Sequence, residues 1–269
     1  MNYSRELLCH NTTMKTITSR ENPLLKNIRK LAASSKERRK AGKTLLDGIH
    51  LVVAYYQAAG MPDTVIVSAS AQENPEIKAF LDNSPPESLI VLADELFRDI
   101  STVDTPTGIV AIITIPQPVE MKSDCLVLLE DIQDPGNMGS ILRSAAAAGI
   151  GQIHLSSGCV DAWSPKVLRA GMGAQFHLSI RENSDLVATA QNFSGQVVAT
   201  ALGTNKSLFN LDLSGPTAFV IGNEGAGISE GLLEVADSKV MIPMPGTAES
   251  LNAAAAAAIC FFERVRQLG

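Results

Sequence analysis

The segment LVLLEDIQDPGNMGSILRSAAAAGI, residues 126–150, carries one arginine among small and apolar residues. Gly139 and Arg143 are four residues apart, so in a helix they share one face, and the glycine leaves room for a ligand beside the guanidinium. A guanidinium held against a ligand can bind phosphate or stabilise developing negative charge. The spacing leaves a second interpretation open, in which Arg143 pairs with the carboxylate of Glu130 or Asp131 and only orients the helix.

A second segment with chemical potential is FVIGNEGAGIS, where an apolar run leads into a glycine-rich loop. Gly222, Gly225 and Gly227 permit positive φ and close approach of the backbone to a ligand, and Glu224 adds a carboxylate. The loop has neither the GxxxxGK[ST] spacing of a phosphate loop nor the GxGxxG spacing of a dinucleotide fold. A ligand-binding loop and a purely structural turn both remain compatible with this pattern.

The third segment, MIPMPGTAESLNAAAAAAICFFERV, joins a strand pattern to a helix pattern through a Pro/Gly loop. We predict Ser250 as the cap of this helix, just as we predict Asn137 as the cap of the helix that carries Arg143. Six successive alanines let a helix approach its neighbour closely. Such a helix is typical of core packing, and close packing is also compatible with a role in a site.

These three segments lie in the second of two predicted domains. Residues 1–13 are expected to be a disordered extension, with Met14 a possible functional start. Residues 14–115 alternate helix and strand patterns and predict an α/β domain. Helices are expected from Asn22-Pro23 to about 41 and around 50–59, 75–81 and 93–100, with strands at KTLLDG, TVIVS, SLIVLA and GIVAIITI.

The alternation restarts after the segment IPQPVEMKSD, residues 115–124, within which the linker is predicted at 116–124. Residues 125–269 carry the strand patterns CLVLLE, QIHLS, QFHLSI, QVVATAL, TAFVIG and KVMIP. Helix patterns at 138–148, 165–172, 185–192, 229–237 and 250–266 separate them. Strands that are apolar on both faces and alternate with helices predict a mostly parallel sheet, with ligands at the carboxyl ends of its strands. Each of the three segments follows such a strand.

Charge is distributed unevenly along the chain. The 269 residues carry a net charge of −6, yet residues 14–45 hold ten Lys or Arg against two Glu, which leaves −14 for the remainder. A basic segment of this kind is compatible with a solvated helix face or with a surface that follows the phosphates of a nucleic acid.

Several classes of protein are disfavoured by the composition. The first residues do not read as a secretory signal, and the longest apolar run, 253–262, is too short to span a bilayer. Four cysteines without CxxC or His-associated spacing suggest neither a disulfide framework nor a zinc site. We therefore expect a cytoplasmic protein with no membrane association and no metal.

The three segments together resemble the motifs of the SpoU (TrmH-like) RNA 2′-O-ribose methyltransferases of the SPOUT superfamily. The first motif corresponds to residues 134–139 (DPGNMG) with Arg143, the second to 222–227 (GNEGAG), and the third to 242–244 (IPM) with 250–252 (SLN). The resemblance covers the whole second domain, including WSPKVLRAGMGAQFHL. It extends more loosely to the first domain through ITSRENPLLK, LLDG and DTPTG.

This resemblance implies an α/β fold in which a carboxy-terminal SPOUT domain, with a mostly parallel sheet and a deep trefoil knot, follows a smaller ribosomal-protein-like RNA-binding domain. It also implies S-adenosylmethionine as cofactor and a homodimer as the working form. By motif, the catalytic residues are Asn137, Arg143, Glu224 and Asn252. The expected cofactor-binding residues are Thr200, Ala201, Leu202, Gly222, Asn223, Gly225, Ile242, Leu251 and Asn252.

The basic amino-terminal segment takes the RNA-binding part in this picture. Two departures weaken the transfer there, since Asp47 stands in LLDG where relatives often have glutamate, and Thr107 stands in DTPTG where they often have glutamine. The residues predicted to contact RNA are Arg20, Asn22, Lys26, Arg29, Lys30, Arg38 and Arg39.

An arginine has a pKa above about 12, so Arg143 is a poor proton acceptor. We therefore assign it to the ribose and adjacent phosphate, where it stabilises the developing alkoxide while a phosphate oxygen or water takes the proton. Ribosomal RNA is the favoured substrate and tRNA the second choice, because a basic domain resembling a ribosomal protein precedes the SPOUT domain. Structured RNA is recognised through shape and backbone, so the sequence does not identify the target nucleotide. The alternatives are a tRNA 2′-O-methyltransferase, a base-methylating relative, and a catalytically silent RNA-binding dimer.

Overall fold

The computed structural model describes residues 13–119, 123–201 and 203–269. The chain divides between Ile115 and Pro116 into two compact units, which are described separately. The predicted linker, 116–124, falls at the start of the second unit.

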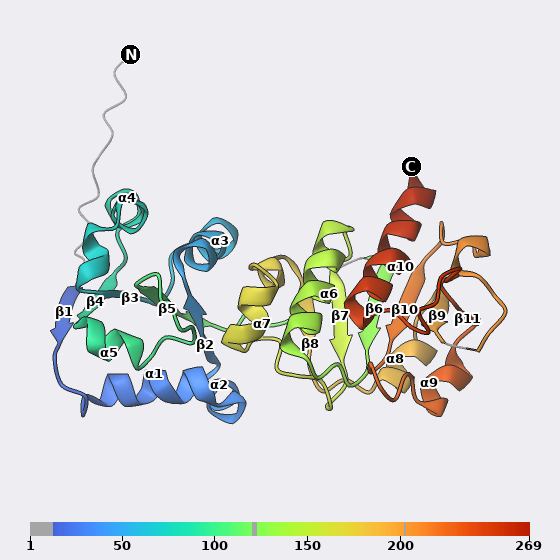
Figure 1. Cartoon of the computed structure of the whole chain (residues 1–269), viewed down its shortest axis with the longest axis horizontal. Coiled ribbons are helices and arrows are strands. Elements are labelled where there is room, and N and C mark those ends of the chain that lie inside the picture. The colour runs from blue at the N-terminus through green and yellow to red at the C-terminus, as the bar shows by residue number, and fades with distance from the viewer. Residues whose placement is uncertain (1–12, 120–122, 202) are drawn as a thin grey trace, which may run out of the picture. The chain divides into compact units, whose positions relative to one another are not determined.

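The first unit is a mixed five-stranded sheet with helices (Figure 1). Its strand order is β1-β4-β3-β5-β2, in which β5 runs antiparallel to both neighbours and the other pairings are parallel. The strands are β1 (Thr13–Ile17), β2 (Lys43–Asp47), β3 (Thr64–Ser68), β4 (Ser88–Leu92) and β5 (Ile109–Thr114). The helices are α1 (Pro23–Ala33), α2 (Ser35–Ala41), α3 (Ile49–Ala59), α4 (Pro75–Asn83) and α5 (Asp94–Arg98), with a 3-10 turn η1 (Ser70–Glu73).

Two features of this unit differ from the sequence prediction. Strand β1 was not predicted, and it begins at Thr13, which the sequence placed in the extension; residues 1–12 lie outside the described residues. The helix expected to run to about 41 is two helices, because Ser34 is extended (φ −129°, ψ 118°) and its side chain accepts a hydrogen bond from the Glu37 N–H. A serine that bonds the backbone locally competes with helix continuation and caps a new helix.

The second unit is built on a six-stranded sheet in the order β11-β9-β10-β6-β7-β8, with every pairing parallel. The strands are β6 (Cys125–Leu129), β7 (Gln152–Leu155), β8 (Ser179–Arg181), β9 (Gln196–Thr200), β10 (Thr217–Ile221) and β11 (Ser238–Val240). The helices are α6 (Pro135–Ala147), α7 (Pro165–Ala170), α8 (Leu186–Gln191), α9 (Glu230–Val235) and α10 (Ala253–Leu268), with 3-10 turns η2 (Ala174–His177) and η3 (Leu208–Asn210).

Helices cover both faces of this sheet, which explains strands that are apolar on both sides. On one face, Leu126, Leu128 and Val220 pack with Leu186 of α8 and Leu232 of α9. On the other face α6 packs against α10 and α7 (Figure 1). The centroids of the Phe219 ring of β10 and the Phe261 ring of α10 are 5.7 Å apart. The predicted parallel sheet is therefore confirmed, whereas the trefoil knot stays a prediction.

The strand expected at QFHLSI is shorter than the pattern suggested. Residues 174–177 form the turn η2, and the strand begins only at Ser179. Gly173 has φ +81°, and the fully buried Gln175 side chain donates from Nε2 to the Val167 carbonyl at 3.0 Å. The Gln175 side chain thus binds α7, and its residue lies in a turn and not in a strand.

Candidate active site

The three motif segments meet at the carboxyl edge of the second sheet. Strands β11, β9, β10 and β6 are neighbours in this order and parallel, so the loops that follow them emerge at one edge. The loop after β6 leads into α6, the loop after β10 is the glycine-rich segment, and the stretch after β11 leads into α10. The main-chain N–H of Glu130 donates to the Ile221 carbonyl at 2.9 Å, which joins the first two loops directly.

A hydrogen-bonded chain of three side chains links the motifs. Asn137 Nδ2 on α6 donates to Glu224 Oε1 at 2.5 Å, and Asn252 Nδ2 donates to Asn137 Oδ1 at 2.8 Å. Because one amide of Asn137 donates on one side and accepts on the other, its orientation is fixed by both partners. Glu224 and Asn252 are 87 and 115 positions away from Asn137 in the sequence, and both are therefore held to the first turn of α6.

The helix caps differ from those predicted. Helix α6 is capped by Asp134, whose Oδ1 accepts from the Asn137 N–H at 2.7 Å, so Asn137 lies inside the first turn and its side chain is free for the network. Helix α10 is capped by Asn252, whose Oδ1 accepts from the Ala254 N–H at 2.9 Å. Ser250 lies before the cap. Asn252 thus uses its oxygen for the helix and its nitrogen for Asn137.

Arg143 is exposed on α6, six residues after Asn137, and is not part of this network. No carboxylate in the described part of the chain forms an ion pair with it. The predicted alternative, pairing with Glu130 or Asp131, is wrong. Glu130 Oε2 accepts from the Ser229 N–H at 2.7 Å, and Asp131 Oδ1 accepts from the Ser156 hydroxyl at 2.6 Å.

Gly139 does not open the helix face to a ligand, contrary to our expectation. A Cβ at this position would lie 2.4 Å from the Ala170 Cβ and 2.6 Å from the Gly171 nitrogen. The missing side chain is therefore filled by the end of α7, which packs directly on the α6 backbone. The glycine serves close helix packing, while Arg143, one turn further along α6, is exposed.

The glycine-rich loop is held by Asn223. Its Oδ1 accepts from the N–H groups of Gly225 at 2.8 Å and Ala226 at 2.9 Å, and its Nδ2 donates to the Asp131 carbonyl at 2.8 Å. Its main chain also exchanges two hydrogen bonds with Gly227, which has φ +74°. These contacts close the loop and present Glu224 toward α6.

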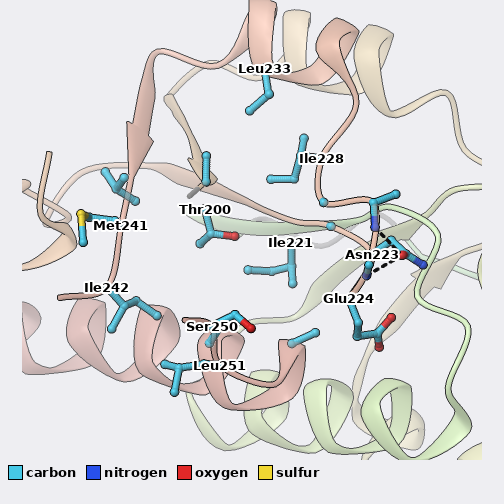
Figure 2. A pocket seen from close by; sticks show the side chains of 18 of the residues that line it. Thr200, Ile221, Asn223, Glu224, Ile228, Leu233, Met241, Ile242, Ser250 and Leu251 are labelled. Carbon is cyan, nitrogen blue, oxygen red and sulfur yellow. Dashed lines mark hydrogen bonds between the residues drawn. The ribbon is translucent and has the colours of Figure 1, made fainter. Parts of the chain in front are cut away.

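A cavity of about 370 Å³ lies beneath this loop (Figure 2). Figure 2 shows Ile228 and Leu233 on one side and Ser250 and Leu251 on the other, with Ile221 between them. Its volume falls in the range of small-molecule sites, and its walls are mainly apolar with a few polar groups at the rim. The predicted cofactor residues that line it are Thr200, Ala201, Gly222, Asn223, Gly225, Ile242 and Leu251.

Two predicted cofactor residues do not line the cavity: Asn252 belongs to the network beside it, and Leu202 lies outside the described residues. Sequence reasoning missed several apolar wall residues at strand ends, in the adjoining loops, on α9 and on the first turn of α10. In a sequence they are indistinguishable from core positions. They are Ile221, Ile228, Leu233, Val240, Met241, Met244, Ala253 and Ala256.

The residues predicted to contact RNA separate into four groups in the structure, of which the last is Arg38 alone. Arg20 and Arg29 pair with Asp99, and Lys26 pairs with Glu21. Asn22 caps α1 by accepting from the Leu24 N–H at 2.9 Å. Lys30 and Arg39 are exposed.

Arg38 is a correction to that prediction. Its side chain is buried, with the residue 4% exposed, and Nη1 donates to the Leu31 carbonyl at 2.7 Å. A guanidinium committed to the end of α1 joins the two helices and cannot reach a phosphate.

The described part of the chain offers little other chemistry. It holds no group of three or more His, Cys, Asp or Glu side chains placed to bind a metal ion. Burial raises the pKa of the Cys125 thiol to about 11 and that of Cys260 to about 12, so both thiols stay protonated at neutral pH. No helix in this part of the chain is long and apolar enough to cross a membrane.

Comparison with known proteins supplies the family. Residues 22–111 match the model of the MRM3-like substrate binding domain. The 23S rRNA (guanosine(2553)-2′-O)-methyltransferase RlmP of Bacillus subtilis is 32% identical over 251 residues, which cover 93% of this chain and 98% of the relative.

Two solved structures are similar over nearly their whole length. The AdoMet-bound rRNA methyltransferase from Sinorhizobium meliloti has a TM-score of 0.79 at 30% identity, with 95% of this chain and 99% of that one covered. The SpoU methyltransferase AviRb from Streptomyces viridochromogenes, in complex with AdoMet, has a TM-score of 0.78 at 28% identity and covers 91% of this chain and 98% of its own. Residues 124–262, which hold the network, the cavity and Arg143, match the model of the SpoU rRNA Methylase family, and the chain belongs to that family.

Proposed function

We propose that this protein transfers a methyl group from S-adenosylmethionine to the 2′-hydroxyl of a ribose in ribosomal RNA, in the cytoplasm. The proposal depends on one observation. Hydrogen bonds join Glu224, Asn137 and Asn252, so three motifs that are distant in the sequence meet beside one cavity. Relatives named for 2′-O-methylation of 23S rRNA and structures bound to AdoMet support the reaction and the donor.

The cavity fits the proposed donor. Its apolar walls suit an adenine ring, and the main-chain N–H groups of Ile242 and Leu251 donate to no acceptor in the described part of the chain, so a bound purine can receive them. Glycine at position 222 is required, since a Cβ there would lie 2.4 Å from the Gly227 carbonyl oxygen and force the loop open. The bound donor supplies an electrophilic methyl group on a positively charged sulfur.

The transfer forms a bond between the ribose oxygen and the methyl carbon and breaks the carbon–sulfur bond, whose electron pair stays on sulfur. The hydroxyl proton must leave as the oxygen attacks. Arg143 is a poor acceptor for it, because a guanidinium carries N–H donors and no acceptor site. Its role is to stabilise the developing alkoxide and bind the adjacent phosphate, while a phosphate oxygen or water takes the proton.

The network gives this chemistry its frame. Glu224, Asn137 and Asn252 orient one another, so the glycine-rich loop, α6 and α10 keep one arrangement around the reacting atoms. Glu224 has a second carboxylate oxygen that the network leaves available to a ribose hydroxyl. Preorganised polar groups of this kind need no reorientation during the reaction.

We also propose a homodimer. The outer face of α10 presents Phe262 and Val265, which are 46% and 38% exposed, four and seven residues after the half-buried Ala258. This spacing forms an apolar stripe on the helix that packs beside α6. Burial of that stripe against a second copy removes it from water, and sedimentation equilibrium of the purified protein tests this: a single-chain mass of 28.5 kDa at micromolar concentration would contradict it.

The activity is tested with labelled S-adenosylmethionine and RNA from a strain that lacks the gene, fractionated into ribosomal and transfer pools and digested to nucleosides. Label in a 2′-O-methylnucleoside from the ribosomal pool is expected. Label confined to the transfer pool would overturn the proposal in favour of a tRNA 2′-O-methyltransferase. Label in a methylated base would favour a base-methylating enzyme, and no label despite donor binding would favour a silent RNA-binding dimer.

The role of Arg143 is tested by Arg143→Ala, which should keep the donor dissociation constant and lose turnover by on the order of 10²–10³. Arg143→Lys keeps the charge but not the planar fork and serves as the matched variant, with an intermediate loss. An Arg143→Ala enzyme that binds the donor poorly but turns over normally at saturating donor would contradict the assignment.

A further inference from the structure

The chain places a methionine where helices usually carry a glycine. Helix α7 ends in a Schellman motif, in which the Met172 N–H donates to the Arg169 carbonyl at 3.1 Å. The Gly173 N–H donates to the Leu168 carbonyl at 3.4 Å. Residue 172 follows the cap, Gly171, and has the left-handed backbone that this motif requires, with φ +52°. Glycine fills this position most often, because an L side chain is strained there.

Packing of the side chain does not explain the methionine. Met172 is 51% exposed, whereas Gly171 and Gly173 on either side of it are buried. The other non-glycine residues with positive φ in the described ranges are Asp131 and Asn183, whose types tolerate this conformation. A large apolar side chain that is both strained and exposed adds little to the stability of the isolated protein. Strain that persists at such a position indicates a role in binding.

The loop that carries Met172 lies against the part of α6 that carries Arg143. A Cβ at Gly139 would lie 2.6 Å from the Gly171 nitrogen, so the end of α7 packs on this turn of α6. Arg143 is one turn further along on the same face, at the roughly 5–6 Å that separates Cβ atoms four residues apart. Side chains on a helix lean toward its amino terminus, so the Arg143 side chain leans back toward Gly139 and the end of α7. The exposed methionine and the exposed arginine therefore border the same space.

We propose that Met172 packs against the base of the RNA nucleotide whose ribose Arg143 binds. This inference rests on the proposed function, because it takes the nucleotide to be methylated as the ligand. A base that has been turned out of the RNA stack exposes both of its aromatic faces. A thioether suits such a face, since sulfur is polarisable and the unbranched side chain adapts its shape. The contact holds the base in place and thereby keeps the 2′-hydroxyl in front of the donor.

The test begins with two substitutions of Met172. Met172→Gly removes the side chain and the backbone strain together, so its thermal midpoint should equal or exceed that of the wild type, by up to about 4 °C. Its single-turnover methylation rate, with saturating donor and transcribed 23S rRNA, should fall about 3–10-fold, because a sulfur–aromatic contact and its apolar burial are lost. Met172→Leu keeps an apolar side chain of similar volume and should retain most of the wild-type rate.

Asn183→Gly is the matched control. Asn183 is exposed, has φ +55° and follows β8, the strand at the far end of the same sheet. Glycine relieves the same backbone conformation there and should leave the methylation rate unchanged. A Met172→Gly enzyme as fast as the Asn183→Gly enzyme would overturn the inference. A Met172→Gly enzyme that is both slower and less stable than the wild type would overturn it too, because the residue would then have a structural role.

A second measurement needs no turnover. Peroxide oxidises an exposed methionine to its sulfoxide, and a base packed on Met172 shields the sulfur. With transcribed 23S rRNA and S-adenosylhomocysteine bound, oxidation of Met172 should slow several-fold relative to N-acetylmethionine added to the same sample, as mass spectrometry would show. Oxidation at the unshielded rate would overturn the inference. A wild type that methylates no RNA but shows this protection would refute the proposed function and leave the contact between Met172 and RNA in place.

Discussion

Replacement of Asn223 by alanine is expected to weaken donor binding by loosening the glycine-rich loop that borders the cavity. The side chain makes three hydrogen bonds, to the N–H groups of Gly225 and Ala226 and to the Asp131 carbonyl. A net hydrogen bond contributes about 0.5–1.5 kcal/mol. The two amides are exposed and water replaces part of their loss, so they count about 0.5 kcal/mol each, whereas the half-buried carbonyl counts about 1 kcal/mol.

The sum of about 2 kcal/mol acts on the closed form of the glycine-rich loop. Because the donor cavity needs that form, its apparent affinity falls with the closed fraction, by up to about 30-fold at 1.4 kcal/mol per factor of ten. Calorimetric titration with S-adenosylmethionine measures this, and thermal unfolding shows whether the domain remains folded. Turnover at saturating donor should fall far less than affinity, because the reacting groups are unchanged.

Two further variants make the result decisive. Asn223→Asp keeps the two acceptor bonds and loses only the donation to Asp131, so its donor affinity should lie between those of the wild type and Asn223→Ala. Asn205→Ala removes an exposed asparagine far from the loop in sequence and serves as the surface control. Donor affinity of Asn223→Ala equal to that of Asn205→Ala would refute the reasoning.

Two other predictions concern packing and titration. Gly139→Ala should destabilise the second unit by about 1–3 kcal/mol in urea unfolding, despite the better helix propensity of alanine, because its Cβ would lie 2.4 Å from Ala170; an unchanged or raised midpoint would contradict the α6–α7 contact. Cys125 and Cys260, with pKa values raised by burial to about 11 and about 12, should resist iodoacetamide at pH 8 in the native protein and react in urea, as mass spectrometry of the labelled peptides would show. Rapid native labelling of either would contradict its burial.

Much of the second unit was predictable because its strands are short apolar runs between helix patterns. The three segments were expected at one edge of a parallel sheet, and the strand order β11-β9-β10-β6 brings them there. The caps were not predictable. Asp134 and Asn137 are both suitable cap residues, and only the backbone geometry shows that Asp134 takes the role and releases Asn137 for Glu224.

The errors elsewhere have a common physical origin. Gly139 and Arg38 each have two plausible uses, and their neighbours decide between them. A glycine on a helix can leave room for a ligand or allow close packing of another helix, and at Gly139 the contact with Ala170 shows that it does the latter. An arginine in a basic segment is normally solvated. Arg38 is buried against the Leu31 carbonyl because the helix breaks at Ser34 and α2 packs on α1, and the sequence pattern did not indicate that break.

The position of β10 in the sheet has a consequence for how the protein is made. Strand β10 lies between β6 and β9, and its Phe219 pairs with Val127, 92 residues earlier. Parallel pairing over such separations requires long loops to close, and the entropy lost in closing them is not offset until the strands pair. Folding is therefore slow, and unpaired strand edges stay exposed in the meantime. The donor cavity also takes Ala253 and Ala256 as walls, so it is completed only when α10 has been synthesised. During synthesis, more than a hundred residues must therefore follow β6 and α6 before the cavity can form. Chaperones would act on the incomplete domain in this interval.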